Sequence, residues 1–161
     1  MSTATPIKEQ EVAASIKEQL GSAVVEVRVD FKDRVTVVAR RETTREVANW
    51  LQRFGFDHTL AVSGVDRLAE KIIEVIYFLS SYSRDDLRHL VLSLKVQLDR
   101  ENPTLCSLVP IWESANLFER ETYEMFGVNF EGHPNLQKLL LQDNWDGPPP
   151  LRKDLKIPEM A

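Results

Sequence analysis

The chain has 161 residues, of which 43% are hydrophobic and 28% charged, and this composition is typical of one compact globular domain. Its net charge of −5 provides no basic surplus for binding nucleic acid. A single cysteine, Cys106, excludes an internal disulfide and a four-thiolate iron–sulfur site.

The first third of the chain predicts two helices around a hairpin. Apolar residues spaced by four predict a helix over 7–20. Alternating valines predict two strands, 25–31 and 35–39, joined by a short turn. The Thr43–Glu46 sequence has the form of a capping box and predicts the start of a helix that ends at Phe54.

The middle of the chain predicts the strongest strands. Residues 57–63 read as an edge strand or an irregular link, and Gly64–Ala69 as a turn or one helical turn. Residues 70–80 are apolar on both faces apart from one glutamate, so we expect a central strand. Residues 89–98 alternate between leucine or valine and polar side chains, which predicts a strand with one buried face.

The last third predicts helices and then an irregular segment. We expect a short helical piece over 108–114 and a helix over 117–126, with Asn116 as its cap and Gly127 as its end. Beyond it, only 136–141 has the pattern of a short helix.

This order of elements indicates an α+β domain over residues 1–131, with a mainly antiparallel sheet packed with helices. An extended C-terminal tail, 132–161, follows. It contains three successive prolines, 148–150, and leucines that it cannot bury alone. We therefore expect it to wrap over a partner.

The polar segment from Glu119 to Glu124 is the first candidate for chemistry. Paired carboxylates can act as acid and base, but a charged helix face is the simpler interpretation. The planar fork of Arg120 suits a fixed ion pair within the domain or across an interface. His133 precedes a proline, as a hydrogen-bonded turn residue often does, and no histidine has the spacing of a metal site. No Gly-rich phosphate loop is present.

Two alternatives to a structural subunit remain open at this point. One is a free-standing hydrolase or isomerase that uses Glu119, Glu121 and His133. The other is a homo-oligomeric binding module assembled through the leucine-rich tail. The first requires those three side chains to converge on one pocket, and the second requires an oligomer in solution.

The stretch 115–128, Ala-Asn-Leu-Phe-Glu-Arg-Glu-Thr-Tyr-Glu-Met-Phe-Gly-Val, closely resembles the signature of the thirty-kilodalton subunit family of complex I. Residues 130–136, Trp145, Gly147 and 151–154 continue the resemblance, and Gly64-Val65-Asp66 and 75–80 extend it upstream. The sequence departs from the family pattern at several positions: Leu117 for an aromatic residue, Glu124 and Asn135 for aspartates, and Gln137-Lys138 for paired arginines. The short chain is similar to the compact forms in archaeal F420H2 dehydrogenases, cyanobacterial or chloroplast complexes and membrane-bound hydrogenases.

The resemblance implies a non-catalytic subunit in the hydrophilic arm of a complex I-type oxidoreductase. It implies no cofactor on this chain, iron–sulfur clusters in partner subunits, and packing against the larger quinone-site subunit, of the forty-nine-kilodalton type. It implies a cytoplasmic, peripheral position in which only partners provide contact with the membrane. The interface or fold-determining positions that it implies are Glu119, Arg120, Glu121, Tyr123, Phe126, Gly127, Gly132, His133, Pro134, Trp145, Arg152, Lys153 and Asp154.

Overall fold

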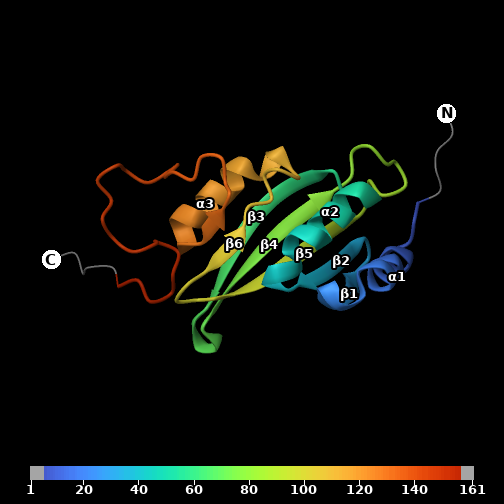
Figure 1. Ribbon diagram of the computed structural model, residues 1–161, viewed down its shortest axis with the longest axis horizontal. Helices are drawn as coiled ribbons and strands as arrows, with labels where there is room; N and C mark the ends of the chain where they lie inside the picture. The colour runs from blue at the N-terminus through green and yellow to red at the C-terminus, as the bar shows by residue number, and fades with distance from the viewer. Residues whose placement is uncertain (1–5, 157–161) are drawn as a thin grey trace.

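The computed structural model describes residues 6–156, and within this range the chain forms three α-helices and seven β-strands (Figure 1). In chain order they are α1 (Glu9–Leu20), β1 (Val24–Phe31), β2 (Arg34–Ala39), α2 (Thr44–Phe54), β3 (His58–Arg67), β4 (Ile72–Ser80), β5 (Val91–Asp99), β6 (Thr104–Cys106), α3 (Asn116–Phe126) and β7 (Asn129–Glu131). No helix in the described range is long and apolar enough to cross a membrane.

Five strands form the main sheet in the order β1-β2-β5-β4-β3. Neighbouring strands are antiparallel except β2 and β5, which run parallel with Val37 opposite Leu94. A parallel pair needs a crossover connection, and here it consists of α2 and the β3–β4 hairpin. The prediction of an α+β fold with a mainly antiparallel sheet is confirmed.

The core lies on the faces of β4 and β5. The predicted alternation of β5 is confirmed, because Leu92, Leu94 and Val96 are fully buried. β4 lies between β5 and β3 and is buried on both faces, as its composition predicts. Glu74 is the charged residue in this strand, and it is buried beside Arg67 and Lys95.

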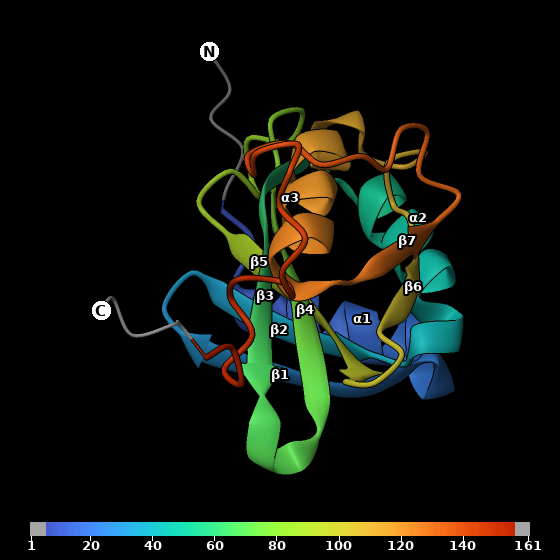
Figure 2. The ribbon, with the colours of Figure 1, turned by 90° about the vertical axis from the view of Figure 1, so that its left-hand side faces the viewer.

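The helices pack at different parts of the sheet. α1 contacts β1 and β2 through its buried face, and α3 contacts β3 at the opposite edge (Figure 2). A second, two-stranded sheet pairs β6 with β7 in parallel, so α3 forms part of the connection between these two strands. α3 thereby contacts β3 of the main sheet and β7 of the β6–β7 ribbon.

Several local predictions were wrong or incomplete. Gly64 belongs to β3, which runs on to Arg67, and only Leu68–Glu70 forms a 3-10 turn. The hydroxyl of Thr43 does not cap α2, because it donates to the carbonyl oxygens of Ala23 and Arg40 instead. The predicted helical piece 108–114 reduces to turns and a 3-10 turn at Glu113–Ala115.

The short helix predicted over 136–141 is also wrong. The N–H groups of Leu139, Leu140 and Leu141 donate to the carboxylate of Glu124 and not to carbonyls one helical turn earlier. A single carboxylate that accepts three successive N–H groups fixes an irregular backbone.

We call residues 132–156 the strap. It follows β7 in the chain. In Figure 1 it makes a wide bend beside α3 and returns toward the end of the main sheet. The described part of the predicted tail therefore lies over a helix of its own domain. Residues 157–161 of that tail, like residues 1–5, lie outside the described residues. Wrapping of the strap over a partner stays a prediction.

Candidate functional site

The charged segment on α3 does not form a uniformly solvated face. Glu119 is fully buried and Glu124 nearly so, whereas Glu121, two residues from Glu119, is exposed. Positions two apart on a helix point to opposite sides, which separates the two glutamates. The interpretation of this segment as a charged helix face is therefore wrong for Glu119 and Glu124.

Glu119 joins three parts of the chain. Its Oε1 accepts hydrogen bonds from the Tyr77 hydroxyl and the Leu108 N–H, both at 2.8 Å, and its Oε2 accepts one from the Ser107 hydroxyl at 2.6 Å. Burial raises the pKa of Glu119 above its ordinary value, although these donors act in the opposite direction. The carboxyl links α3 to β4 and to the segment after β6.

Glu124 binds the strap. Its two carboxylate oxygens accept the N–H groups of Leu139, Leu140 and Leu141 at 3.2, 2.8 and 2.8 Å. Burial alone would raise the pKa of Glu124, but the three N–H bonds outweigh it and the pKa lies below its ordinary value. Backbone N–H groups of the strap therefore stabilise the negative charge of Glu124.

Arg120 acts on the same segment. Its Nε and Nη2 donate to the carbonyl oxygens of Gln137 and Lys138 at 3.1 and 2.9 Å. Among the described residues Arg120 forms no ion pair, and its guanidinium fork holds two successive backbone carbonyls instead. An ion pair of Arg120 across an interface stays a prediction. Arg120 and Glu124, one helical turn apart, thus fasten adjacent parts of the strap.

His133 serves as a turn residue, as its sequence context predicts. Its Nδ1 accepts the N–H of Asn135 at 3.0 Å, which requires the proton on Nε2, and Nε2 donates to the Asn116 carbonyl at 3.1 Å. Gly132 before it adopts a φ of +80°, and Pro134 after it is exposed. Both ring nitrogens of His133 are therefore occupied by backbone groups.

The hydrolase or isomerase hypothesis requires Glu119, Glu121 and His133 to share a pocket. Glu119 is enclosed by its three donors, and Glu121 lies at a different depression, beside Gly64 and Met125. The structure does not bring the three side chains together. Within residues 6–156 there is also no group of three or more histidine, cysteine or acidic residues arranged to hold a metal ion.

The end of the strap is fixed by an arginine that sequence reasoning missed. Arg100 is buried and donates to both carboxylate oxygens of Asp66, at 2.7 and 2.9 Å, and to Asp154 at 2.7 Å. The N–H of Lys153 also donates to Asp66 at 2.8 Å, and the side chain of Arg152 donates to the Phe126 carbonyl at 2.8 Å. The hydrogen bond to Arg100 is the main reason that the pKa of Asp66 is lowered.

Two glycines allow these close approaches. A Cβ on Gly64 would lie 2.5–2.8 Å from ring carbons of Phe126, so β3 and α3 touch directly at this point. Gly127 ends α3 with a φ of +75°, as predicted for a helix stop, and a Cβ there would lie 3.0 Å from Pro149. Both the positive φ and the short distance favour glycine at position 127.

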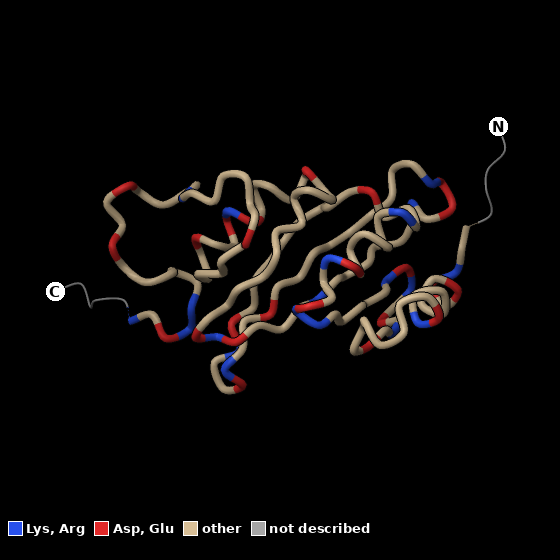
Figure 3. Tube along the Cα trace, in the orientation of Figure 1, with Lys and Arg blue, Asp and Glu red and all other residues tan. Residues whose placement is uncertain are grey.

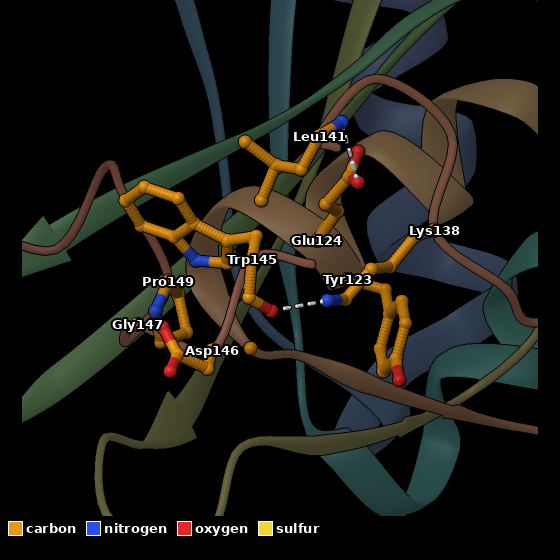
Figure 4. Close-up of a pocket in the computed structure, with 9 residues that line it drawn as sticks. Tyr123, Glu124, Lys138, Leu141, Trp145, Asp146, Gly147 and Pro149 are labelled. Atoms are coloured by element: carbon orange, nitrogen blue, oxygen red, sulfur yellow. Dashed lines mark hydrogen bonds between the residues drawn. The ribbon is translucent and has the colours of Figure 1, made fainter. Parts of the chain in front are cut away.

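A cavity of about 240 Å³ lies between α3 and the bend of the strap (Figure 4). Tyr123 and Glu124 line it from the helix, and Lys138, Leu141 and Trp145 line it from the strap. The Lys138 ammonium donates to the Trp145 carbonyl across it at 2.6 Å. The strap thus forms hydrogen bonds within itself as well as with α3.

Known proteins resemble this chain over most of its length. The family model of the respiratory-chain NADH dehydrogenase 30 Kd subunit matches residues 37–160. An F420H2 dehydrogenase subunit of Methanosarcina mazei is 35% identical over 144 residues, which cover 89% of each chain. An NADH-quinone oxidoreductase subunit of Roseiflexus sp. (strain RS-1) is 37% identical over 153 residues, which cover 89% of this chain and 84% of that protein.

Solved structures show the same fold. A chain of the archaeal membrane-bound sulfane sulfur reductase superposes with a TM-score of 0.80 at 22% identity, covering 92% of this chain and 85% of that one. The trypsin-resistant fragment 1–134 of Nqo5 superposes with a TM-score of 0.68 at 25% identity, covering 81% of this chain and all of the fragment. The chain belongs to the family of the thirty-kilodalton subunit of respiratory-chain NADH dehydrogenase.

Proposed function

We propose that this chain is a non-catalytic structural subunit in the hydrophilic arm of a complex I-type energy-converting oxidoreductase. Such a complex transfers electrons to a quinone or a related acceptor and couples the transfer to ion translocation. Membership of the thirty-kilodalton family supports the assignment, because two relatives bear the names of F420H2 dehydrogenase and NADH-quinone oxidoreductase subunits.

The hydrogen-bond partners of the polar side chains in the family signature support the proposal that this subunit is non-catalytic. Glu119, Arg120, Glu124 and His133 all bond to groups of the chain itself, mostly to its backbone. A catalytic group needs a free lone pair or proton that faces a substrate. Arg120, Glu124 and His133 instead fix the strap against α3. Glu119 fixes α3 to β4 and to the segment after β6.

The partners follow from the same assignment. The larger quinone-site subunit, of the forty-nine-kilodalton type, is the expected neighbour of α3 and the strap, with iron–sulfur subunits nearby. This chain itself binds no cofactor in the proposal, and the clusters belong to the partners. It occupies the cytoplasmic side of the membrane and is held there by the other subunits.

Affinity purification of the tagged chain from mildly solubilised membranes tests the proposal. Mass spectrometry should find the larger quinone-site subunit and iron–sulfur subunits in constant ratio to the tagged chain, and the input subunits would identify the electron donor. Recovery of the chain alone, or only with unrelated proteins, would refute the assignment. Purified separately, the chain should show no visible absorbance and no bound iron, and a stoichiometric chromophore would contradict the non-catalytic role.

A further inference from the structure

Several polar contacts attach the strap to its own domain, and two groups of them involve a carboxylate. The first, which we call the Glu124 clasp, is the carboxylate of Glu124 with the three successive N–H groups that begin at Leu139. The second, the Arg100 clasp, joins the buried Arg100–Asp66 pair to Asp154 and to the N–H of Lys153. Both clasps use charged acceptors or donors, which make the stronger class of hydrogen bond.

The strap exposes four large apolar side chains. Leu140 is 63% exposed and Leu151 55%, and Leu139 and Trp145 are exposed to a smaller extent. We call these four side chains the strap face. Large apolar side chains exposed along one short segment mark a binding surface.

We propose that the strap is a docking element that is already formed in the free chain, held by the two clasps, and that its face binds a protein partner with an apolar surface and a basic margin. This inference rests on the proposed function, because it takes the partner to be a subunit of the same complex. It adds that the strap does not fold when the partner arrives. Glu124 is then a positioning residue for assembly.

Charge indicates the kind of partner. Residues 139–151 contain Asp143 and Asp146 and no lysine or arginine, and both aspartates are exposed. In Figure 3 the outer bend of the strap accordingly shows two acidic segments and no basic one. An anionic membrane surface would repel this bend, whereas a protein surface with lysine or arginine around an apolar patch would attract it.

Preformation has a consequence for assembly. A disordered segment loses conformational entropy when it binds, which lowers its affinity for a given area of contact. A strap whose backbone is already fixed avoids most of that loss. Gly127 contributes to this order, because its lack of a Cβ lets Pro149 approach the end of α3.

Hydrogen exchange of the full-length chain on its own tests preformation. The amides of residues 139–141 should be protected in the wild-type chain. Glu124→Gln should speed their exchange about tenfold or more, because the charged acceptor is lost. Glu121→Gln, which removes the same charge from the exposed side of α3, should leave them unchanged. Exchange of these wild-type amides at the rate of an unstructured peptide would overturn the proposal.

A second set of amides and a second variant distinguish opening of the strap from loosening of the whole domain. Amides of β5 report on the domain core, and they should exchange at the wild-type rate when only the strap opens. Asp154→Asn weakens the other clasp from its exposed side, so it should speed exchange over residues 152–154 and leave β5 unaffected. Equal exchange in wild type and both clasp variants would refute the role of the clasps.

Assembly of the complex tests the partner. Leu140→Ser should reduce the co-purified subunits about fivefold or more, since a buried leucine contributes strongly to an interface. Leu68→Ser, at an exposed leucine of the β3–β4 turn, is the matched control and should leave co-purification unchanged. Loss of association that is equal for the two variants would overturn the assignment of the strap face.

Sedimentation with vesicles of phosphatidylcholine and phosphatidylglycerol tests the lipid alternative. The wild-type chain should stay in the supernatant. Binding to the vesicles that Leu140→Ser abolishes would replace the protein partner with a membrane surface. Failure of the wild-type chain to co-purify with any subunit would refute the proposed function, whereas unprotected strap amides would refute only the preformed strap.

Discussion

Arg100 donates two hydrogen bonds to the carboxylate of Asp66, at 2.7 and 2.9 Å, and both side chains are almost fully buried. Asp154 accepts a third bond from the same guanidinium but is half exposed. The pair therefore lies where β3 ends and the strap returns to the domain. A buried charge that loses its partner is costly because the remaining charge has neither water nor a counter-ion.

Arg100→Met should accordingly lower the free energy of unfolding by about 3–5 kcal/mol. Asp154→Asn removes only a partly exposed contact and should cost less than about 1 kcal/mol. Urea unfolding of the full-length chain at pH 7 measures both. Equal losses in the two variants would show that the Asp66 charge is better solvated than its burial indicates.

Replacement of Glu119 separates its charge from its hydrogen bonds. Glu119→Ala leaves the Tyr77 hydroxyl, the Ser107 hydroxyl and the Leu108 N–H without their acceptor, and each such loss costs about 1–3 kcal/mol. We expect a total loss of roughly 3 kcal/mol or more by urea unfolding. Glu119→Gln should be much milder, because its amide oxygen can still accept and the hydroxyl of Ser107 can rotate to accept from its amide nitrogen.

The same residue predicts a pH dependence. Because burial raises the pKa of Glu119 in the folded state above its ordinary value of about 4.5, the folded chain binds this proton more tightly than the unfolded chain. Its contribution is thus most favourable below that ordinary value and is lost as the pH rises through the folded-state pKa. Wild type should lose stability relative to Glu119→Gln over this range, and parallel pH profiles would contradict the prediction.

Sequence patterns predicted the strands in which burial follows one regular pattern along the whole length. The leucine alternation around Leu94 and the doubly apolar β4 correspond directly to burial in the sheet. The parallel contact between β2 and β5 was not predicted, because it joins segments more than fifty residues apart. The β6–β7 ribbon was missed for a similar reason, since each strand has only three residues.

The candidate site was predicted as a set of positions but not as a set of contacts. Resemblance to the thirty-kilodalton family identified Arg120 and Asp154, whereas Glu124 stood out only as a departure from the family pattern. No sequence pattern indicates that backbone groups of the strap are the main partners of α3. Arg100 was missed because an isolated arginine after a strand looks like an ordinary surface residue. Only the fold shows that it faces Asp66.

Gly64 determines how closely α3 approaches β3. A methyl group at this position would lie 2.5–2.8 Å from the ring of Phe126, and overpacking of this kind costs about 1–3 kcal/mol. Gly64→Ala should lower the free energy of unfolding by that amount. In a double-mutant cycle the same change in a Phe126→Leu background should cost clearly less, because the smaller side chain makes room. Additive costs would mean that helix movement, and not the ring, absorbs the methyl group.

Substitution of Arg120 distinguishes most clearly whether this residue has a structural or a mechanistic role. Its guanidinium holds the carbonyls of Gln137 and Lys138, so Arg120→Ala should release the start of the strap and lower the amount of assembled complex severalfold. Arg120→Lys retains the charge but has no planar fork, so its effect should be intermediate.

Turnover must be measured per assembled complex, with subunit amounts determined by mass spectrometry of the purified material. A structural role predicts that Arg120→Ala complexes that do assemble turn over at close to the wild-type rate, because the side chain bonds only to the strap. A loss of tenfold or more per complex corresponds to about 1.4 kcal/mol of transition-state stabilisation. Such a loss, with unchanged subunit ratios, would place Arg120 in the mechanism and refute the purely structural role of α3.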